Sequence, residues 1–351
     1  MGLKDRIIGA GFAAFRLTGL HRLAGVATRG RGAVLMLHNV RPWRPPSPGF
    51  TPNRLLEITP EFLDDVLGLA RRMGFDFVTM DEASTRLADG DAPPFLALTF
   101  DDGYRDTATF ALPVLERHRA PFTVYVATGF ADRGAGMWWL ELEAALRAAD
   151  HIAIDDEGLS LALPAATPRQ KSDAFERIYW ALRGGSEAGL LRVVGSLAER
   201  HGVDRAAIVE TLCMDWPEIA ALAGHPLATI GAHSVSHKML AKWPIEIARE
   251  EMGASKRRIE QMLGRPVRHF AYPVGDPTSA ARREFDLARE LGFASAVTTR
   301  PGMLFAAHRD HLTALPRVSL NGNWQDIGYC EVLLSGAPFA LWNRGRRLNV
   351  D

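Results

Sequence analysis

Two clusters of ionisable residues, well separated along the chain, have the side chains that metal binding and proton transfer require. Asp101 and Asp102 are neighbours and directly follow the apolar run of residues 95–100. His233 and His237 stand four residues apart in the segment His-Ser-Val-Ser-His. Because adjacent side chains differ in direction, one carboxylate could bind a cation while the other takes a proton from water. Two imidazoles and a carboxylate, with water or substrate completing the shell, suit zinc or a similar divalent metal ion.

Each cluster also has a simpler explanation. Acidic residues at a strand-to-helix turn commonly cap the following helix. Two histidines can pack or cap, and their i, i+4 spacing places both rings on one face only if residues 234–237 form a helical turn. His308 and His311 are a competing pair. They follow no predicted strand and lie among polar residues, so we expect a solvated loop there.

The elements that must position these residues alternate between short apolar runs and amphipathic stretches. Amphipathic patterns at residues 60–73, 105–117, 245–263 and 279–291 predict helices. Alternation of strand and helix implies an α/β protein with parallel strands and right-handed crossovers. Seven or eight such units favour a barrel over an open sheet. The predicted strands are residues 33–37, 75–79, 95–100, 122–127, 228–232, 268–272, 294–298 and 315–320.

Other polar residues and turns fall near the C-terminal ends of predicted strands, the face where parallel barrels assemble active sites. His38 ends the first strand, and Arg317 lies in the last one. Pro273 and Gly275 follow the strand at residues 268–272. The convergence of these residues with the two clusters predicts a single site at this face.

Residues 137–224 break the alternation and are rich in Ala, Leu, Arg and Glu. They predict a mostly helical insertion, too long for an ordinary barrel connection, that forms a cap or wall near one face. Trp138 and Trp139 at its start are favoured as core anchors over a platform on which a ligand ring stacks. We expect this insertion and the proline-rich loop at residues 41–48 to shape the substrate pocket. The predicted organisation is an amphipathic helical segment at residues 1–30, the barrel at residues 31–330 and a C-terminal tail at residues 331–351.

Composition limits the functional classes. The 351 residues, 47% of them hydrophobic, can bury a large core. Lys plus Arg and Asp plus Glu are equal at 41 each, so no overall field recruits nucleic acid, and we expect no nucleic-acid partner. Cys213 and Cys330 lack metal-type spacing and are compatible with a reducing compartment.

The N-terminal segment is basic and amphipathic. Arg16 interrupts what would be the apolar core of a signal peptide, and no convincing cleavage site follows. The chain has no run of roughly 18 uncharged apolar residues, so we predict no membrane-spanning helix. Packing on its own domain is favoured for this segment, with peripheral membrane contact through residues 1–27 as the alternative. We expect a cytoplasmic or inner-membrane-associated protein.

The two clusters closely resemble the first two motifs of a known family. Residues 99–103, Thr-Phe-Asp-Asp-Gly, and residues 233–237 are similar to those motifs of the polysaccharide deacetylases, the NodB-like carbohydrate esterases. Residues 270–275, Phe-Ala-Tyr-Pro-Val-Gly, look like the third motif in altered form. The resemblance covers roughly residues 92–320 outside the insertion, and it implies the NodB homology fold, a distorted barrel of about seven strands.

The resemblance also implies residue roles. It assigns one divalent metal ion to Asp102, His233 and His237, with zinc as the first candidate and cobalt, nickel or manganese as others. Asp101 would be the general base. By analogy with the third motif, the backbone N–H of Val274 would bind the oxyanion, and Pro273 would hold the turn.

The sequence departs from the family pattern at the third motif. Ala271 stands where the family usually has an arginine that holds the catalytic aspartate. Arg317 is a candidate replacement, with a surface salt bridge as the alternative. His38 is the expected general acid, because no late Leu-x-His motif stands out, and a buried structural histidine is the alternative. The expected substrate contacts are Tyr104, Pro273, Gly275 and Asp276.

The leading hypothesis is therefore a metal-dependent hydrolase that removes N-acetyl groups from an amino sugar in a polysaccharide, oligosaccharide or glycolipid precursor. One alternative is a deformylase or cyclic-amide hydrolase acting on a smaller molecule, and relatives of that kind often lose metal ligands. The other is a catalytically silent glycan-binding protein. Retention of Asp101 argues against it, because binding alone needs no base.

Overall fold

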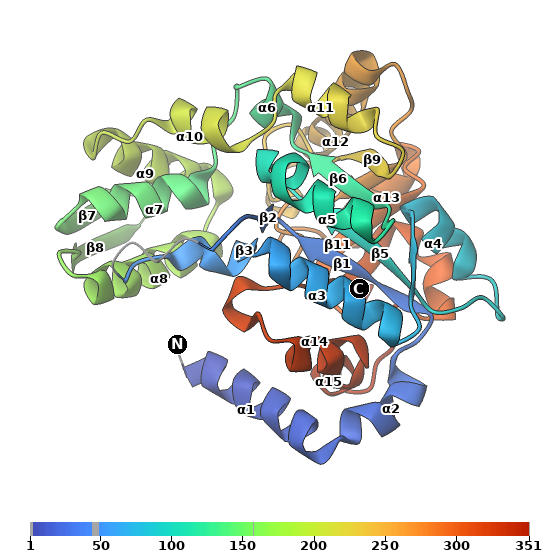
Figure 1. Ribbon diagram of the computed structural model, residues 1–351. Coiled ribbons are helices and arrows are strands. Elements are labelled where there is room, and N and C mark those ends of the chain that lie inside the picture. Colours follow the sequence, from blue (N-terminus) through green and yellow to red (C-terminus); the bar gives the residue numbers. More distant parts are fainter. Residues whose placement is uncertain (1–2, 44–48, 157, 351) are drawn as a thin grey trace.

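The computed structural model describes residues 3–43, 49–156 and 158–350 (Figure 1). Residues 44–48 of the predicted proline-rich loop lie outside the described residues. A parallel β-sheet forms the centre of the molecule and is surrounded by helices (Figure 1). Its strands are β1 (Gly32–Leu37), β4 (Asp76–Val78), β5 (Phe95–Phe100), β6 (Phe122–Val126), β9 (Ala228–Ala232), β10 (His269–Ala271), β11 (Ser295–Pro301) and β12 (Leu315–Ser319).

The sheet closes into a barrel because β1 pairs with both β12 and β5. The order around the ring is β1-β12-β11-β10-β9-β6-β5. Strand β4 pairs with residues 95–97 of β5, and β6 pairs with residues 98–100, so these two strands share one edge of β5. The ring therefore has seven parallel strands, which confirms the predicted (β/α)7-type barrel. All eight predicted strands are present, with small shifts at their ends.

Helices cover the outside of the barrel and bury their apolar faces against it. Helix α3 begins at Pro60, where the sequence predicted a helix, and Thr59 caps it because its hydroxyl accepts a 3.1 Å hydrogen bond from the N–H of Phe62. A π-helical turn at Thr107–Ala111 precedes α5, and together they occupy the predicted helix at residues 105–117. The helices in this layer are α3 (Pro60–Arg72), α4 (Met80–Arg86), α5 (Leu112–Arg117), α12 (Ile245–Leu263) and α13 (Arg282–Glu290).

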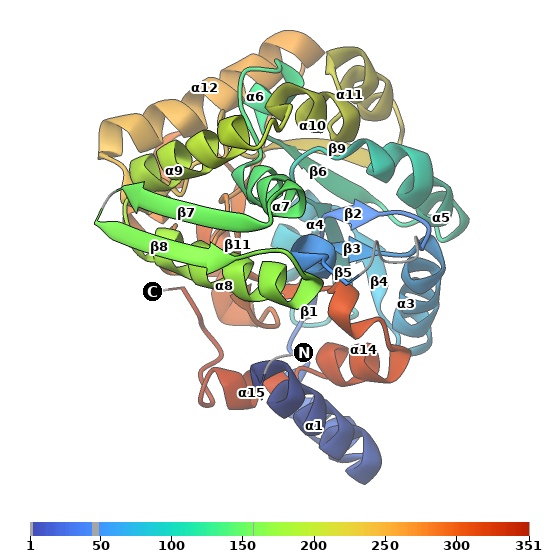
Figure 2. The same ribbon diagram turned by 90° about the vertical axis from the view of Figure 1, so that its left-hand side faces the viewer.

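Most of the insertion between β6 and β9 packs around its own apolar cluster, whereas its last helix packs in the cluster outside the barrel. It lies to one side of the barrel in Figure 1 and faces the viewer in Figure 2. A β-hairpin inside it was not predicted, although Ile152 and Ile154 are buried and their neighbours are exposed, which is the alternation of a half-buried strand. Trp138 and Trp139 are buried in the cluster. The elements of the insertion, between β6 and β9, are α6 (Thr128–Ala131), α7 (Trp138–Ala148), β7 (His151–Asp156), β8 (Leu159–Pro164), α8 (Pro168–Gly184), α9 (Glu187–Arg200), α10 (Arg205–Leu212) and α11 (Trp216–Ala223).

The two ends of the chain pack together. Helix α1 (Leu3–Thr18) contacts α14 (Ile327–Leu334), and α2 (Leu20–Thr28) contacts α15 (Ala337–Trp342). The ring of Phe12 stacks on Tyr329 at a centroid distance of 5.1 Å. The N-terminal segment thus packs on its own chain. Among the described residues, no helix has the length and apolar character needed to cross a membrane.

Short elements complete the structure. A two-stranded sheet of β2 (Asn39–Val40) and β3 (Glu57–Ile58) continues from the end of β1. The remaining turns are η1 (Pro52–Leu56), η3 (Leu240–Lys242), η4 (Ala306–Asp310), η5 (Leu312–Ala314) and η6 (Gly322–Trp324). The prediction of a solvated loop around His308 is wrong. Its side chain is 0% exposed within η4, and its Nδ1 accepts a 3.0 Å hydrogen bond from the N–H of Phe305.

Candidate active site

Alternation along the strands decides which side chains enter the barrel. On β5, Phe95 and Ala97 pack in the inner apolar cluster, whereas Leu96 packs in the outer one. Because successive side chains of a strand point to opposite faces, the next odd position beyond the strand, Asp101, points inward. The same alternation on β1 and β12 directs His38 and Arg317 into the barrel. The structure thus brings residues from three strands to the C-terminal mouth.

Asp102, His233 and His237 converge beside this mouth. The Nε2 atoms of both histidines lie 3.3 Å from Oδ1 of Asp102. One ligand atom from each residue lies within 4.8 Å of the others, and all three side chains are buried. Within the described residues, this is the one group of three ligand side chains with such spacing.

The backbone around this trio is unusual. Asp102, Ser234 and His237 have φ angles of 68°, 60° and 57° in the left-handed region, which side-chain-bearing residues seldom adopt. Residues 234–237 therefore do not form the helical turn that the i, i+4 spacing had suggested. Such strained positions cluster at functional sites, where the surrounding structure must hold them.

One carboxylate of α12 holds the loop between the two histidines. Oε2 of Glu251 accepts hydrogen bonds from the N–H groups of Val235 and Ser236, at 3.0 and 2.8 Å. Its Oε1 accepts from the Ser236 hydroxyl at 2.6 Å and pairs with Lys238 at 2.7 Å. Glu251 thereby fixes the N–H groups of this loop, and the carbonyls of Ser234 and Val235 accept hydrogen bonds from Thr128 and Gly129.

The donor set fits a divalent cation. Nδ1 of His233 donates a 2.7 Å hydrogen bond to the carbonyl of Ala271, so the lone pair of the neutral ring is on Nε2 and faces Asp102. Oδ1 of Asp102 is buried and has no hydrogen-bond partner among the described residues. Burial opposes ionisation of Asp102, but the two imidazoles outweigh it and hold its pKa well below the usual value. A buried carboxylate facing two imidazole nitrogens is stabilised by a positive charge between them, and these three residues could hold such an ion.

Arg317 forms a bidentate ion pair with Asp101 through both terminal nitrogens. Nη1 and Nη2 each donate a 2.7 Å hydrogen bond to one oxygen of the carboxylate. Nε of Arg317 donates to the carbonyl of Thr298 at 2.8 Å, and Nη1 also reaches the Thr99 hydroxyl at 3.1 Å. The surface salt bridge considered for Arg317 is thus not what forms, because its side chain is fully buried. Burial favours the neutral acid, but Arg317, with smaller effects from His233 and His38, lowers the pKa of Asp101 and keeps it ionised.

His38 faces the same carboxylate from β1. Its Nε2 lies 3.9 Å from Oδ2 of Asp101, and the side chain is 16% exposed at the pocket. Burial is the main cause that lowers the pKa of His38, and the two aspartates only partly offset it. The ring is therefore neutral near pH 7 and can accept a proton.

The turn after β10 places a backbone N–H at the pocket. Val274 lines the pocket and has a φ of 62°, a strained value for a β-branched residue. Its carbonyl accepts a 2.7 Å hydrogen bond from the Thr299 hydroxyl, and no acceptor for its N–H occurs among the described residues. Gly275 has a φ of 64°, and a Cβ there would lie 2.7 Å from the backbone nitrogen of Thr299, so this position requires glycine.

Not all predicted substrate contacts line the pocket. Tyr104 was expected to contact substrate, but its side chain is only 1% exposed and packs in the core of the insertion. Pro273 and Gly275 shape the turn, but of its three residues only Val274 lines the cavity. Asp276 accepts a 2.6 Å hydrogen bond from Arg183 of α8, so it ties the insertion to the turn instead of lining the pocket.

The pocket above these residues has a volume of about 590 Å³. One wall comes from the insertion, as the sequence predicted, although its residues were not singled out: Ser172, Phe175, Glu176, Tyr179 and Trp180 of α8. The sequence did not identify the other wall, η1 with Asn53, Leu55 and Leu56. Trp138 and Trp139 are both core and wall, and the ring of Trp139 lies 4.7 Å from that of His237. The aromatic spacing of α8 was the available signal, but it is also that of an ordinary buried helix face.

Comparison with known proteins agrees with this geometry. The sequence matches the polysaccharide deacetylase family over residues 89–296. A search of curated proteins finds no match. Among solved structures, the deacetylase PplD of Streptococcus pyogenes, in complex with acetate, is 18% identical, with a TM-score of 0.53 and coverage of 83% of this chain and 92% of that one. IcaB from Ammonifex degensii is also 18% identical, with a TM-score of 0.52 and coverage of 88% and 97%.

The family match extends over more than half of the chain, and the structural matches show the same fold. The protein is thus a hydrolase of amide carbon–nitrogen bonds. It belongs to the polysaccharide deacetylase family.

Proposed function

We propose that this protein is a metal-dependent deacetylase that removes N-acetyl groups from an amino sugar in a glycan or glycolipid precursor. The observation that carries the proposal is the meeting of two groups in one pocket: the trio Asp102, His233 and His237, and the ionised Asp101 clamped by Arg317. Zinc is the first candidate for the ion, since two imidazoles and one carboxylate with an open position form a frequent catalytic zinc site.

The residues divide the work of amide hydrolysis. An ion held by the trio would polarise the acetyl carbonyl and lower the pKa of a water molecule. Asp101 accepts a proton from this water as its oxygen bonds to the carbonyl carbon. The N–H of Val274 donates a hydrogen bond to the oxygen that becomes negatively charged. The neutral His38, whose Nε2 lies 3.9 Å from Oδ2 of Asp101, then takes up this proton from Asp101 and passes it to the sugar nitrogen as the carbon–nitrogen bond breaks, which yields acetic acid and a free amine.

The shape of the pocket supports a sugar substrate. Trp180 is 63% exposed at the wall formed by α8, where a flat ring can pack against the apolar face of a sugar. Leu55 of η1, 40% exposed, adds an apolar surface nearby. A pocket of this size accommodates more than an acetyl group, and this favours an oligosaccharide or glycolipid over a small formamide or cyclic amide.

A location in the cytoplasm or at the inner membrane remains part of the proposal. The basis for membrane contact is a separate surface on the terminal helices, away from this pocket.

The decisive experiment measures metal content and acetate release from N-acetylated oligosaccharides by the purified full chain. We expect one divalent ion per chain and acetate as the product. Asp101→Asn should abolish acetate release and retain sugar binding, whereas Asp286→Asn, a surface change on α13, should leave both unchanged. Formate from formamides would favour the smaller-substrate alternative. Sugar binding without any acetate, despite bound metal, would leave only the glycan-binding alternative.

A further inference from the structure

The N-terminal helices present an apolar face to solvent. Leu17 at the end of α1 and Leu20, Leu23 and Val26 of α2 are 86%, 55%, 76% and 93% exposed. Three of them recur at every third position of α2, so they lie along one side of that helix. We call these four residues the apolar face.

Exposure of the apolar face does not mean that these helices lack packing partners, because their other sides pack against the rest of the chain. Phe12 of α1 stacks on Tyr329, and His21 of α2 is buried. Arg22 donates a 2.9 Å hydrogen bond to Glu331 of α14. The helices are therefore anchored to the domain by one side and expose the other.

Helix α15 extends this surface. It contacts α2, and its Leu341 and Trp342 are 70% and 60% exposed. The terminal helices form one end of the molecule in Figure 1, and Figure 2 shows α1 and α15 side by side there. Six large apolar side chains thus stand exposed on neighbouring helices, far more than scattered surface leucines would give.

The two terminal segments are basic, although the whole chain is balanced at 41 basic and 41 acidic residues and Arg16 and Arg22 pair with Asp326 and Glu331. Residues 337–351 contain three arginines and one acidic residue, Asp351. Residues 1–31 contain six basic residues and one acidic residue, namely Lys4, Arg6, Arg16, Arg22, Arg29 and Arg31 against Asp5. Charge and apolar surface therefore coincide at the two ends of the chain.

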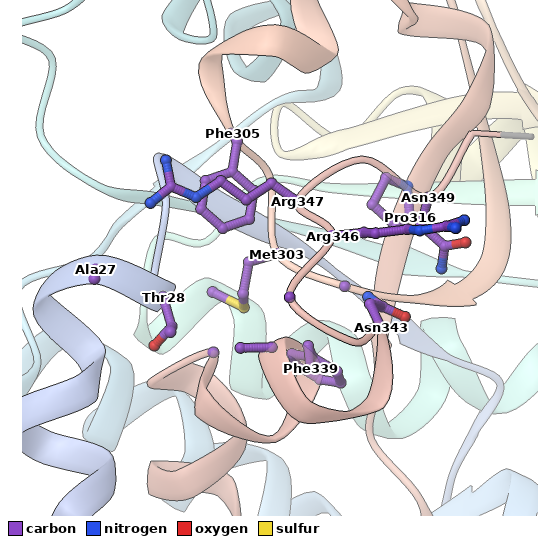
Figure 3. A pocket seen from close by; sticks show the side chains of 14 residues that line it. Ala27, Thr28, Met303, Phe305, Pro316, Phe339, Asn343, Arg346, Arg347 and Asn349 are labelled. Carbon is purple, nitrogen blue, oxygen red and sulfur yellow. The ribbon is translucent and has the colours of Figure 1, made fainter.

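A pocket of about 190 Å³ lies between the end of α2 and the segment after α15. Ala27 and Thr28 line one side of it, and Arg346 and Arg347 line the other (Figure 3). The guanidinium of Arg347 lies over the ring of Phe305, 5.2 Å from its centroid. Two guanidinium groups beside the last turn of an exposed apolar helix suit an acidic headgroup whose acyl chains lie under that helix.

We propose that the apolar face and α15 dock on the surface of an anionic phospholipid bilayer. Helix α2 lies in the plane of the interface, with its leucines among the acyl chains and the arginines at the phosphates. Trp342 has the amphipathic ring that prefers this boundary. Lipid is the occupant because exposed apolar side chains stand beside arginines of both terminal segments, the combination that complements an anionic bilayer surface. The proposal does not depend on the chemistry of the active site.

The test is co-sedimentation of the full chain with vesicles of phosphatidylcholine alone and of phosphatidylcholine with phosphatidylglycerol. We expect binding to the anionic vesicles that weakens as salt is added. The variant Leu20→Ser/Leu23→Ser/Val26→Ser should bind at least about tenfold more weakly. Arg346→Gln/Arg347→Gln, an independent change, should weaken binding to anionic vesicles by about tenfold. The matched control Ile245→Ser/Ile247→Ser alters side chains of α12 that are 38% and 40% exposed, and it should bind like the original chain.

Three outcomes would overturn the proposal. The first is a chain that sediments with neither kind of vesicle or equally with both. The second is unchanged binding by the triple serine variant, with its helical circular dichroism intact. The third is a dimer in light scattering that the same serine changes dissociate, because a second copy would then cover the surface.

Discussion

Replacing Arg317 by methionine should destabilise the protein mainly because it leaves the charge of Asp101 buried and unpaired. Two charge-assisted hydrogen bonds of 2.7 Å join these side chains, and both are almost fully shielded from water. Each such bond contributes about 1.5–3 kcal/mol, and breaking a buried ion pair costs about 3–5 kcal/mol. The Arg317→Met variant should lose stability in that range and most of its acetate release.

Adding Asp101→Asn to Arg317→Met should restore part of the stability, because the second change removes the stranded charge. The coupling energy of this double-mutant cycle should reach about 3 kcal/mol. The assay is urea unfolding followed by circular dichroism, with chelator present throughout so that no bound ion contributes. Both single variants and the double variant should be inactive, so stability and activity separate in the double variant.

A matched cycle controls for general loss of packing. Glu141 of the insertion is a buried carboxylate that pairs with Arg205 at 2.7 Å and shares no partner with Arg317. Glu141→Gln combined with Arg317→Met should be additive within about 0.5 kcal/mol. A coupling energy below about 1 kcal/mol for Asp101 and Arg317, or equal coupling in the control cycle, would refute the view that Arg317 specifically offsets the charge of Asp101.

Three further predictions concern the ion, the pocket wall and acid stability. Adding zinc to chelator-treated protein should raise its melting temperature by several degrees, and His237→Gln should remove most of this rise in differential scanning fluorimetry. Trp180→Ala should raise KM for an N-acetylated oligosaccharide about three- to tenfold with little change in kcat, whereas Trp342→Ala should leave both unchanged; a fall in kcat alone would contradict stacking at Trp180. Burial lowers the pKa of His308 to about 4, so the unfolded chain binds a proton that the folded chain does not, and stability should fall by about 2 kcal/mol between pH 7 and pH 5. His308→Asn retains an acceptor for the N–H of Phe305 and should remove that part of the acid sensitivity in urea titrations at the two pH values, and an unchanged pH dependence would show that other groups cause it.

The sequence was most informative where local pattern and tertiary role coincide. Helix α12 spans Ile245–Leu263, the residues that periodicity predicted. The acids and histidines were recognisable because parallel barrels collect such residues after their strands. Asp102, His233 and His237 were therefore predictable as neighbours, although nothing local indicated the left-handed backbone that brings them together.

Features set by contacts across the chain were harder to predict. Arg317 could be offered only as one candidate partner of Asp101, because 216 residues separate them. The walls from η1 and α8 have no chemical signature, since leucines and aromatic residues at helical spacing occur in any core. Tyr104 stood next to the motif and was expected at the substrate, but the turn at Asp102 and Gly103 sends its side chain into the core. The hairpin β7–β8 was missed because its short alternating runs lie among helix-forming residues.

Because the barrel closes through β1, the site can be completed only late in the synthesis of the chain. β12 joins the ring by pairing with β1, and it also carries Arg317. A ribosome that has released only residues 1–300 has already exposed Asp101, Asp102 and both histidines, but not the arginine that holds Asp101. The nascent chain therefore contains nearly all the reactive side chains in an incomplete arrangement. Emergence of β12 allows the barrel to close and also completes the site. Unfinished chains should therefore be inactive even when most of the barrel has been synthesised.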